Sequence, residues 1–138
     1  MTPEQWETIR YFKSGENFGD PAKMSYLLLL TLDNLREFIG LPIVIHCGYE
    51  AGGHSENSYH YKGMAVDCHA KDLPLADFYF AATRFGFHGI GVYPWWNNPG
   101  LHLDIRPSHP FTGRAFWGST AAGEYCALDS KFLEKYFA

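Results

Sequence analysis

Apolar and polar residues alternate along this 138-residue chain in patterns that first predict two helices. A capping-box start at Thr2 predicts a helix that runs to about Phe12. An N-cap at Asp20, followed by Pro21, predicts a second helix that ends at Gly40. The apolar surface of this second helix is broad, so we expect it to be the main helix of the core.

The same patterns predict two later helices and several short strands. One helix is expected over residues 74–85, after an N-cap at Asp72, and a last one over 130–136. Strands are expected at residues 42–47, at 65–67, near residue 90, at 101–105 and, as an edge strand, at 114–117. Without repeats or linkers, the chain is predicted to form one α+β domain over residues 1–138.

A long polar loop over residues 48–59 leads into the first candidate chemistry. It contains three glycines, and its length is unusual enough to indicate a function. His60 follows the loop, and Gly63 permits a tight bend into the strand that carries Asp67. The bend therefore leaves His60 on the loop side, while Asp67 points out of the sheet.

The strand at 101–105 carries the second part of this chemistry. Leu101, Leu103 and Ile105 alternate with His102 and Asp104, which therefore share one face of the strand. If this strand lies beside the strand at 65–67, the histidine and the earlier candidate residues converge on one surface of one sheet.

His60, Asp67 and His102 together fit one Zn²⁺ ion. Three protein ligands leave one tetrahedral position open, which is the arrangement of catalytic zinc rather than of structural zinc. Taken singly, each residue has an ordinary explanation as a loop histidine, a turn aspartate or a half-buried histidine. An aspartate and a histidine inside apolar strands are nevertheless costly unless paired or metal-bound, and one shared ion satisfies both.

The motif S-x-H-x-x-G-x-A-x-D over residues 58–67, followed by His102, resembles the M15 family of zinc peptidases. Segments 35–45, 89–94 and 102–106 resemble further parts of that family, so the resemblance covers roughly residues 11–117. It implies a small, mainly antiparallel sheet with helices packed on one face. It also implies a single zinc ion and peptidoglycan stem peptides as substrate, cut by a D-Ala-D-Ala carboxypeptidase or an endopeptidase.

Residues 54–67 are also similar to the zinc segment of the hedgehog signalling domain. That domain shares the peptidase fold and zinc set but acts as a binding protein. The alternative to an enzyme is therefore a non-catalytic zinc module whose aromatic loops bind a partner, because a fold alone does not decide function.

Three positions depart from these related proteins. Many of the peptidases carry an acidic general base three residues before the second zinc histidine, where this chain has Pro99. Hedgehog-like domains place a glutamate six residues before that histidine, where this chain has Trp96. Many peptidases also carry an arginine at the position of Glu50, so a carboxylate here replaces a guanidinium.

Two residues are candidates for the missing catalytic group. Asp104 shares a strand face with His102, and it could either orient that histidine or act on the zinc-bound water. His54 matches a histidine that lines the hedgehog-type site, and it could stabilise an oxyanion or shuttle a proton. The alternatives are a strand-end salt bridge of Asp104 with Arg106 or Arg114, and a solvated loop position for His54.

Candidate substrate-binding residues come from the high aromatic content, which is 17% of the chain. Tyr93, Trp95 and Trp96 form a loop run that would stack on a sugar or pack against a peptide stem. The alternative is that these rings cover a small core. Glu50, on the long loop, completes the set of candidates.

Composition excludes several other classes of function. The net charge is −4 and no basic run occurs, so nucleic acid is not an expected partner. Three cysteines without a tight pattern do not indicate a disulfide framework, and Cys68 is expected to point into the core. The longest apolar run, over residues 26–30, is too short to span a membrane.

The N-terminal residues lack the layout of a secretion signal, so cytoplasmic synthesis is expected. Release or virion association, as for phage lysis enzymes, is one way in which such a protein reaches the wall. The sequence leaves the oligomeric state open. It predicts a zinc-dependent peptidase that cuts a bond involving a D-amino acid in peptidoglycan stem peptides.

Overall fold

The computed structural model describes residues 1–138 as a six-stranded sheet with helices. The helical elements are α1 (Pro3–Glu7), η1 (Pro21–Lys23), α2 (Tyr26–Ile39), η2 (Tyr59–Lys62), α3 (Leu75–Ala82) and α4 (Ser130–Phe137). The strands are β1 (Ile43–Cys47), β2 (Ala65–Ala70), β3 (Gly89–Tyr93), β4 (Gly100–Asp104), β5 (Ala115–Ala121) and β6 (Glu124–Cys126).

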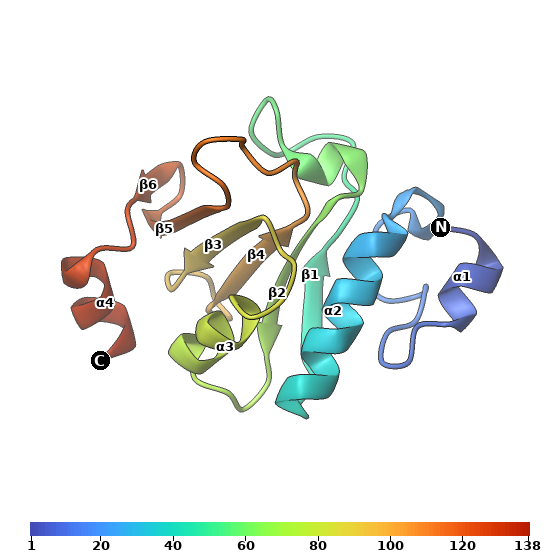
Figure 1. The fold of residues 1–138 in the computed structure, drawn as a ribbon, viewed down its shortest axis with the longest axis horizontal. Helices are drawn as coiled ribbons and strands as arrows, with labels where there is room; N and C mark the ends of the chain where they lie inside the picture. The colour runs from blue at the N-terminus through green and yellow to red at the C-terminus, as the bar shows by residue number, and fades with distance from the viewer.

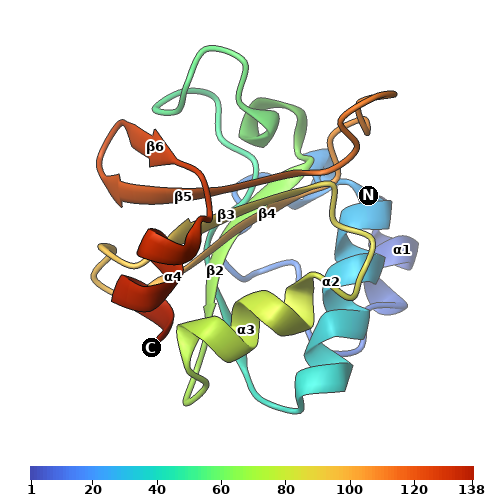
Figure 2. The ribbon, with the colours of Figure 1, turned by 60° about the vertical axis from the view of Figure 1, so that its left-hand side comes forward.

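The sheet has the order β1-β2-β4-β3-β5-β6, and only the β3–β5 pair is parallel. Helices α2 and α3 cover one face, and the loop before η2 rises on the opposite side (Figures 1 and 2). The predicted α+β fold, with a mainly antiparallel sheet and helices packed on one face, is thus confirmed. None of the helices is both long and apolar enough to cross a bilayer.

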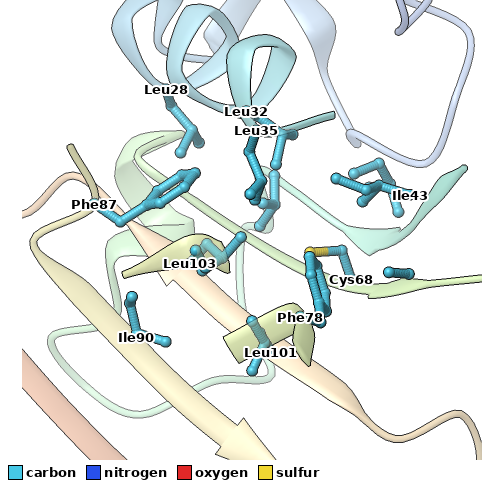
Figure 3. Packing of buried hydrophobic residues seen from close by; sticks show 14 of the residues in the cluster. Leu28, Leu32, Leu35, Ile43, Cys68, Phe78, Phe87, Ile90, Leu101 and Leu103 are labelled. Atoms are coloured by element: carbon cyan, nitrogen blue, oxygen red, sulfur yellow. The ribbon is translucent and has the colours of Figure 1, made fainter. Parts of the chain in front are cut away.

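The core fills the space between α2, α3 and the sheet. Leu28, Leu32 and Leu35 of α2 point toward the sheet, where β4 carries Leu101 and Leu103, and all five side chains are fully buried (Figure 3). Fully burying one such side chain stabilises a fold by about 1.5–3 kcal/mol. Because β4 directs its leucines toward the helices, its alternate polar residues must face the other side of the sheet.

The first helices differ from the prediction in their bounds. α1 has the predicted capping box at Thr2 but ends at Glu7 rather than near residue 12. Beyond it, the backbone N–H groups of Arg10 and Tyr11 donate to the carboxylate of Asp33 in α2, which replaces helical hydrogen bonding there. A contact distant in sequence therefore ends this helix early.

The predicted helix over residues 20–40 is divided in two. Asp20 caps only the short turn η1, and Ser25 is a second N-cap that starts α2. The backbone N–H of Ser25 donates to the carbonyl of Gly63, which ties this break to the segment before β2. Gly40 ends α2 in a left-handed conformation, as predicted.

Two further predictions were wrong in detail. Asp72 does not cap α3 but occupies a left-handed turn, and α3 ends at Ala82. Arg114 donates to the carbonyls of Thr83, Phe85 and Phe87, so the chain after α3 is held in a non-helical path. The strand predicted at residues 114–117 is the first part of β5, which pairs only with β3, whereas β6 pairs with residues 118–121 of β5, beyond the predicted segment.

Candidate metal centre

Local structure explains how His60 reaches the sheet. Ser58 caps the short turn η2 by accepting a hydrogen bond from the backbone N–H of His60 at 3.2 Å. Gly63 ends the turn with φ +67°, and a Cβ atom there would lie 1.8 Å from the carbonyl oxygen of Lys23. Only glycine fits this bend, which leads the chain directly into β2.

Strands β2 and β4 bring the other two predicted ligands together. Asp67 and His102 lie directly opposite each other in the antiparallel pair. The distance from Asp67 Oδ1 to His60 Nε2 is 3.1 Å, and to His102 Nδ1 it is also 3.1 Å. The three candidate ligand atoms lie within 4.8 Å of one another, so the predicted set does converge on one point.

Hydrogen bonds on the far sides of the two rings show which nitrogens are free. His60 Nδ1 lies 2.8 Å from the carbonyl oxygen of Gly48, so this nitrogen carries the proton and donates it. His102 Nε2 lies 2.7 Å from Asp104 Oδ2 and donates in the same way. The remaining lone pairs of His60 and His102 therefore both point at the Asp67 carboxylate.

Three electron-pair acceptors thus face one another with no donor between them. Such an arrangement is repulsive unless a cation or an added proton lies among them. Two imidazole nitrogens and one carboxylate oxygen are ligands that suit Zn²⁺. The second hydrogen bond of each histidine is also the usual support for a metal-binding imidazole. The donor set of His60, Asp67 and His102 therefore fits this ion.

The protonation of these groups follows from their surroundings. Burial alone would raise the pKa of Asp67, but the close contacts of its carboxylate with the imidazoles of His102 and His60 outweigh it and hold that pKa well below its usual range. Burial would lower the pKa of His102, yet hydrogen bonds to Asp104 and Asp67 raise it to about 9. In the absence of a metal, a proton on His102 is therefore the favourable partner of these carboxylates.

A second possible cluster, made of Cys47, His54 and His60, is less suited to a metal. His60 Nδ1 already donates to a backbone carbonyl. Burial and the nearby Asp67 carboxylate raise the pKa of the Cys47 thiol above its ordinary value, so the sulfur stays protonated. Its S–H donates to Asp67 Oδ2 at 3.3 Å, and the thiol thereby orients the carboxylate. Cys68 is fully buried in the core, as predicted.

Asp104 lies behind His102 and is completely buried. Oδ2 accepts from His102 Nε2, and both carboxylate oxygens accept from Arg106. Hydrogen bonds from His102 and Arg106 overcome the effect of burial and hold the pKa of Asp104 well below its usual range. Of the two roles left open by the sequence, this placement favours orientation of His102 over action on a water molecule.

A cleft of about 860 Å³ opens above the three ligands. Tyr93, Trp95 and Trp96 line it, whereas Glu50 does not. Trp96 stacks on Tyr93 with 4.4 Å between ring centroids. Glu56 also lines the cleft, as do four residues that were not assigned to the site from the sequence, namely Tyr59, Arg106, Trp117 and Tyr125. Arg106 could have been found, since it follows His102 and Asp104 at the same spacing of two residues.

His54 also lines the cleft, and its ring stacks on that of His60 with 4.1 Å between centroids and 13° between planes. Burial and the neighbouring His60 lower the pKa of His54 below its ordinary value. The other six histidines all use a ring nitrogen in a hydrogen bond, but neither ring nitrogen of His54 has a protein partner. No buried side-chain nitrogen or oxygen lacks a partner, so the ring nitrogens of His54 reach solvent.

The remaining histidines lie outside the ligand set. His46 Nε2 and His69 Nδ1 are 2.6 Å apart on neighbouring strands β1 and β2. The edge of the His46 ring also approaches Trp96, with 5.4 Å between centroids. His46 therefore supports an aromatic wall of the cleft, and it does not contact the candidate ligands.

Two comparisons with known proteins agree with this geometry. Residues 46–110, which include all three candidate ligands, match the family described as peptidoglycan L,D-endopeptidase MepK, an M15 peptidase family. The chain is also 26% identical over 127 residues to a probable peptidoglycan L,D-endopeptidase MepK from Haemophilus influenzae. That alignment covers 82% of this chain and 67% of the relative. Both comparisons therefore support the resemblance of this chain to the M15 family of peptidases.

Proposed function

We propose that this chain is a zinc-dependent peptidase that hydrolyses a peptide bond in the stem peptides of peptidoglycan. The observation that carries the proposal is the convergence of two imidazole lone pairs and one carboxylate on the floor of an aromatic cleft. The printed names of the matching family and relative supply the substrate class. Both matches are peptidases, so they lend no support to a non-catalytic binding module.

His60, Asp67 and His102 would hold the ion. When bound, Zn²⁺ would act as a Lewis acid that activates water and polarises a peptide carbonyl. The protein contributes the orientation of the ligands. Gly48 and Asp104 fix the two imidazole rings, and the Cys47 thiol fixes the free oxygen of the carboxylate.

His54 is the group that we assign to proton transfer. Its ring nitrogens reach solvent in the cleft and have no protein partner, so they are available to accept and return a proton during hydrolysis. Asp104 has both oxygens engaged by His102 and Arg106, and it is buried behind the ring. We therefore assign it the positioning of His102. Tyr93 and Trp96, stacked at the cleft wall, would pack against the substrate.

The scissile bond is proposed by comparison. The relative is described as an L,D-endopeptidase, which cuts an internal bond between an L- and a D-amino acid. We propose the same bond type for this chain, rather than removal of a terminal D-alanine. Both activities fit a zinc centre in an open cleft, so the products of the reaction have to distinguish them.

The test is to incubate zinc-loaded protein with purified peptidoglycan and to analyse the fragments by liquid chromatography and mass spectrometry. Endopeptidase action releases cross-linked fragments as smaller peptides with new amino termini, whereas carboxypeptidase action releases free D-alanine. Cleavage should disappear in His60→Ala and persist in the control His109→Ala, whose ring lies on an exposed turn. Absence of any cleavage by fully metal-loaded protein across several wall types would refute the proposal.

A further inference from the structure

The guanidinium of Arg106 is held in the cleft by Asp104. Arg106 Nε lies 3.0 Å and 3.1 Å from the two carboxylate oxygens, and Nη2 lies 2.7 Å from Oδ2. The arginine therefore uses the edge formed by Nε and Nη2 for this ion pair. Since Asp104 is itself completely buried and bound to His102, the pair has little freedom to move.

Two aromatic rings contact the same guanidinium. Its central carbon lies 4.9 Å from the centroid of the Tyr59 ring and 5.0 Å from that of the Trp117 ring. Cation–π contacts with both rings favour one orientation of the arginine. Its position is thus set before any substrate arrives, which reduces the conformational entropy lost on binding.

The other edge of the guanidinium is free. Nη1 makes no hydrogen bond with the protein, and no buried side-chain nitrogen lacks a partner, so Nη1 reaches solvent. Arg106 lines the cleft and is the only lysine or arginine that does so. The edge formed by Nη1 and Nη2 therefore offers two parallel N–H donors and a positive charge to a ligand in the cleft.

We propose that Arg106 binds a free carboxylate of the peptide substrate, on the residue that adjoins the scissile bond. A carboxylate is the group that matches two parallel N–H donors and a positive charge, whereas a neutral amide oxygen would use only part of this edge. The assignment deepens the proposed peptidase function and rests on it. It makes Arg106 a specificity-determining residue that also links the substrate, through Asp104, to the ligand His102.

Two carboxylates of a stem peptide have the required chemistry. One is the terminal carboxylate of a peptide that ends next to the scissile bond. The other is the second carboxylate of a diamino acid within the chain. Both present the same pair of oxygens to Arg106, so peptides that are amidated at one carboxylate at a time can separate them.

The experiment compares three synthetic stem peptides that differ only in amidation: both carboxylates free, the terminal one amidated, or the internal one amidated. For zinc-loaded wild-type protein, kcat/KM should be about tenfold to a hundredfold higher for the peptide with both carboxylates free than for the peptide in which the carboxylate bound by Arg106 is amidated. In Arg106→Gln this preference should disappear, because kcat/KM falls for the carboxylate peptide and stays nearly unchanged for the amide. The peptide whose amidation matters identifies the source of the carboxylate.

Lys62→Gln is a matched control, because it removes the same charge near Tyr59 but from a residue that does not line the cleft. This variant should keep the preference. Arg106→Lys keeps the positive charge beside Asp104 but loses the paired N–H donors of the planar guanidinium. This variant should therefore fold and bind zinc, while its preference for the carboxylate peptide over the amide falls. Zinc content measured on every variant separates a damaged metal centre from a lost substrate contact.

Two outcomes would overturn this assignment. One is a wild-type protein that cuts all three peptides equally well. The other is a loss of the same factor for every peptide in both arginine variants, which a purely structural role of Arg106 predicts. If the wild-type protein cuts none of the peptides, the proposed activity fails. Calorimetric binding of the three uncut peptides then still decides whether Arg106 selects a carboxylate.

Discussion

Neighbouring groups give His54 and His60 different tasks, although His54 lies within the loop over residues 48–59 and His60 directly follows it. His60 has one ring nitrogen bound to the carbonyl of Gly48, so its other nitrogen is a fixed electron-pair donor. His54 has no side-chain partner, but its backbone is held firmly. The hydroxyl of Tyr61 donates to the carbonyl of His54 at 2.6 Å and accepts from its N–H at 2.9 Å.

Tyr61→Phe should therefore release His54 without disturbing the metal ligands. The substitution keeps the aromatic ring, which lies edge-on to His54, and removes both hydrogen bonds of the hydroxyl. We expect kcat to fall by about tenfold, because a general acid–base group that is poorly positioned loses part of its contribution. Zinc content should not change, and it can be measured beside turnover on peptidoglycan.

Tyr136→Phe serves as the control for this change, since the Tyr136 hydroxyl has no hydrogen-bond partner in the protein and lies on α4. It should leave turnover unaltered. Full activity of Tyr61→Phe would show that the two hydrogen bonds between the Tyr61 hydroxyl and the His54 backbone have no part in the mechanism. Loss of zinc together with activity would indicate that these hydrogen bonds support η2 and His60 instead.

Single residues were predictable from the sequence where a motif specifies both the residue and its spacing from the other residues of the site. The spacing of His60 and Asp67 and the strand alternation around His102 were enough to find a set that converges in the structure. Glu50 was proposed to bind substrate, but it does not line the cleft. The direction of a side chain on a long loop depends on contacts that no local pattern contains. Arg106 was expected only as an alternative salt-bridge partner of Asp104, and its place in the cleft, beside Tyr59 and Trp117, was not predicted.

Strands β2, β3 and β4 place the charged residues by their register. Gly89 of β3 lies opposite Asp104 of β4, and Gly91 lies opposite His102. A Cβ atom at Gly89 would lie 2.4 Å from both oxygens of Asp104. The absence of a side chain at Gly89 therefore provides the space in which the Asp104 carboxylate reaches His102.

Gly89→Ala should consequently weaken zinc binding and destabilise the fold. The added methyl group would push Asp104 away from His102, and overpacking of this kind costs about 1–3 kcal/mol. Zinc affinity should fall by about tenfold to a hundredfold, as for the loss of a group that orients a ligand. Urea unfolding and competition with a chelator measure the two effects.

Gly86→Ala, just before the same strand, is the matched control because no atom lies within 4 Å of the added Cβ and its φ is not positive. Its stability and zinc affinity should match the wild type. If Gly89→Ala bound zinc as tightly as the control, the Asp104–His102 contact would have no part in the metal centre.

The elements themselves were predicted best where the local signal was strong. The end of α2 at Gly40 and the start of α4 at Ser130 agree with the structure, because cap residues act within one turn. The early end of α1 depends on Asp33, more than 20 residues away. The outer position of β6 likewise depends on sheet pairing, which a local pattern does not specify.

The whole molecule separates stability from chemistry across one sheet. Helices α2 and α3 cover one face of the sheet (Figure 2), where the apolar side chains are buried. The opposite face carries the ligands, which line the cleft. Between His60, Asp67 and His102, charge balance requires either a metal ion or a proton. Removal of the metal should therefore make the stability of the entire fold depend on pH.

The sign of this dependence follows from His102. In metal-free protein its pKa is raised to about 9, so its proton stabilises the fold fully below its ordinary pKa of 6.5 and is lost as pH rises through about 9. Asp67 and Asp104, with lowered pKa values, stay ionised throughout this range. His46, His54 and His69, whose pKa values are lowered mainly by burial, stay neutral.

The melting temperature of chelator-treated protein should therefore fall between pH 6.5 and pH 9, by roughly 4 °C for each kcal/mol of lost stabilisation. The melting temperature of zinc-loaded protein should change less with pH, because the metal replaces the proton. The difference in melting temperature between zinc-loaded and metal-free protein should therefore widen as pH rises. Thermal unfolding followed by circular dichroism measures both. In His102→Gln the widening should vanish. A difference that stays constant across the range in wild-type protein would mean that these three side chains do not share one positive charge.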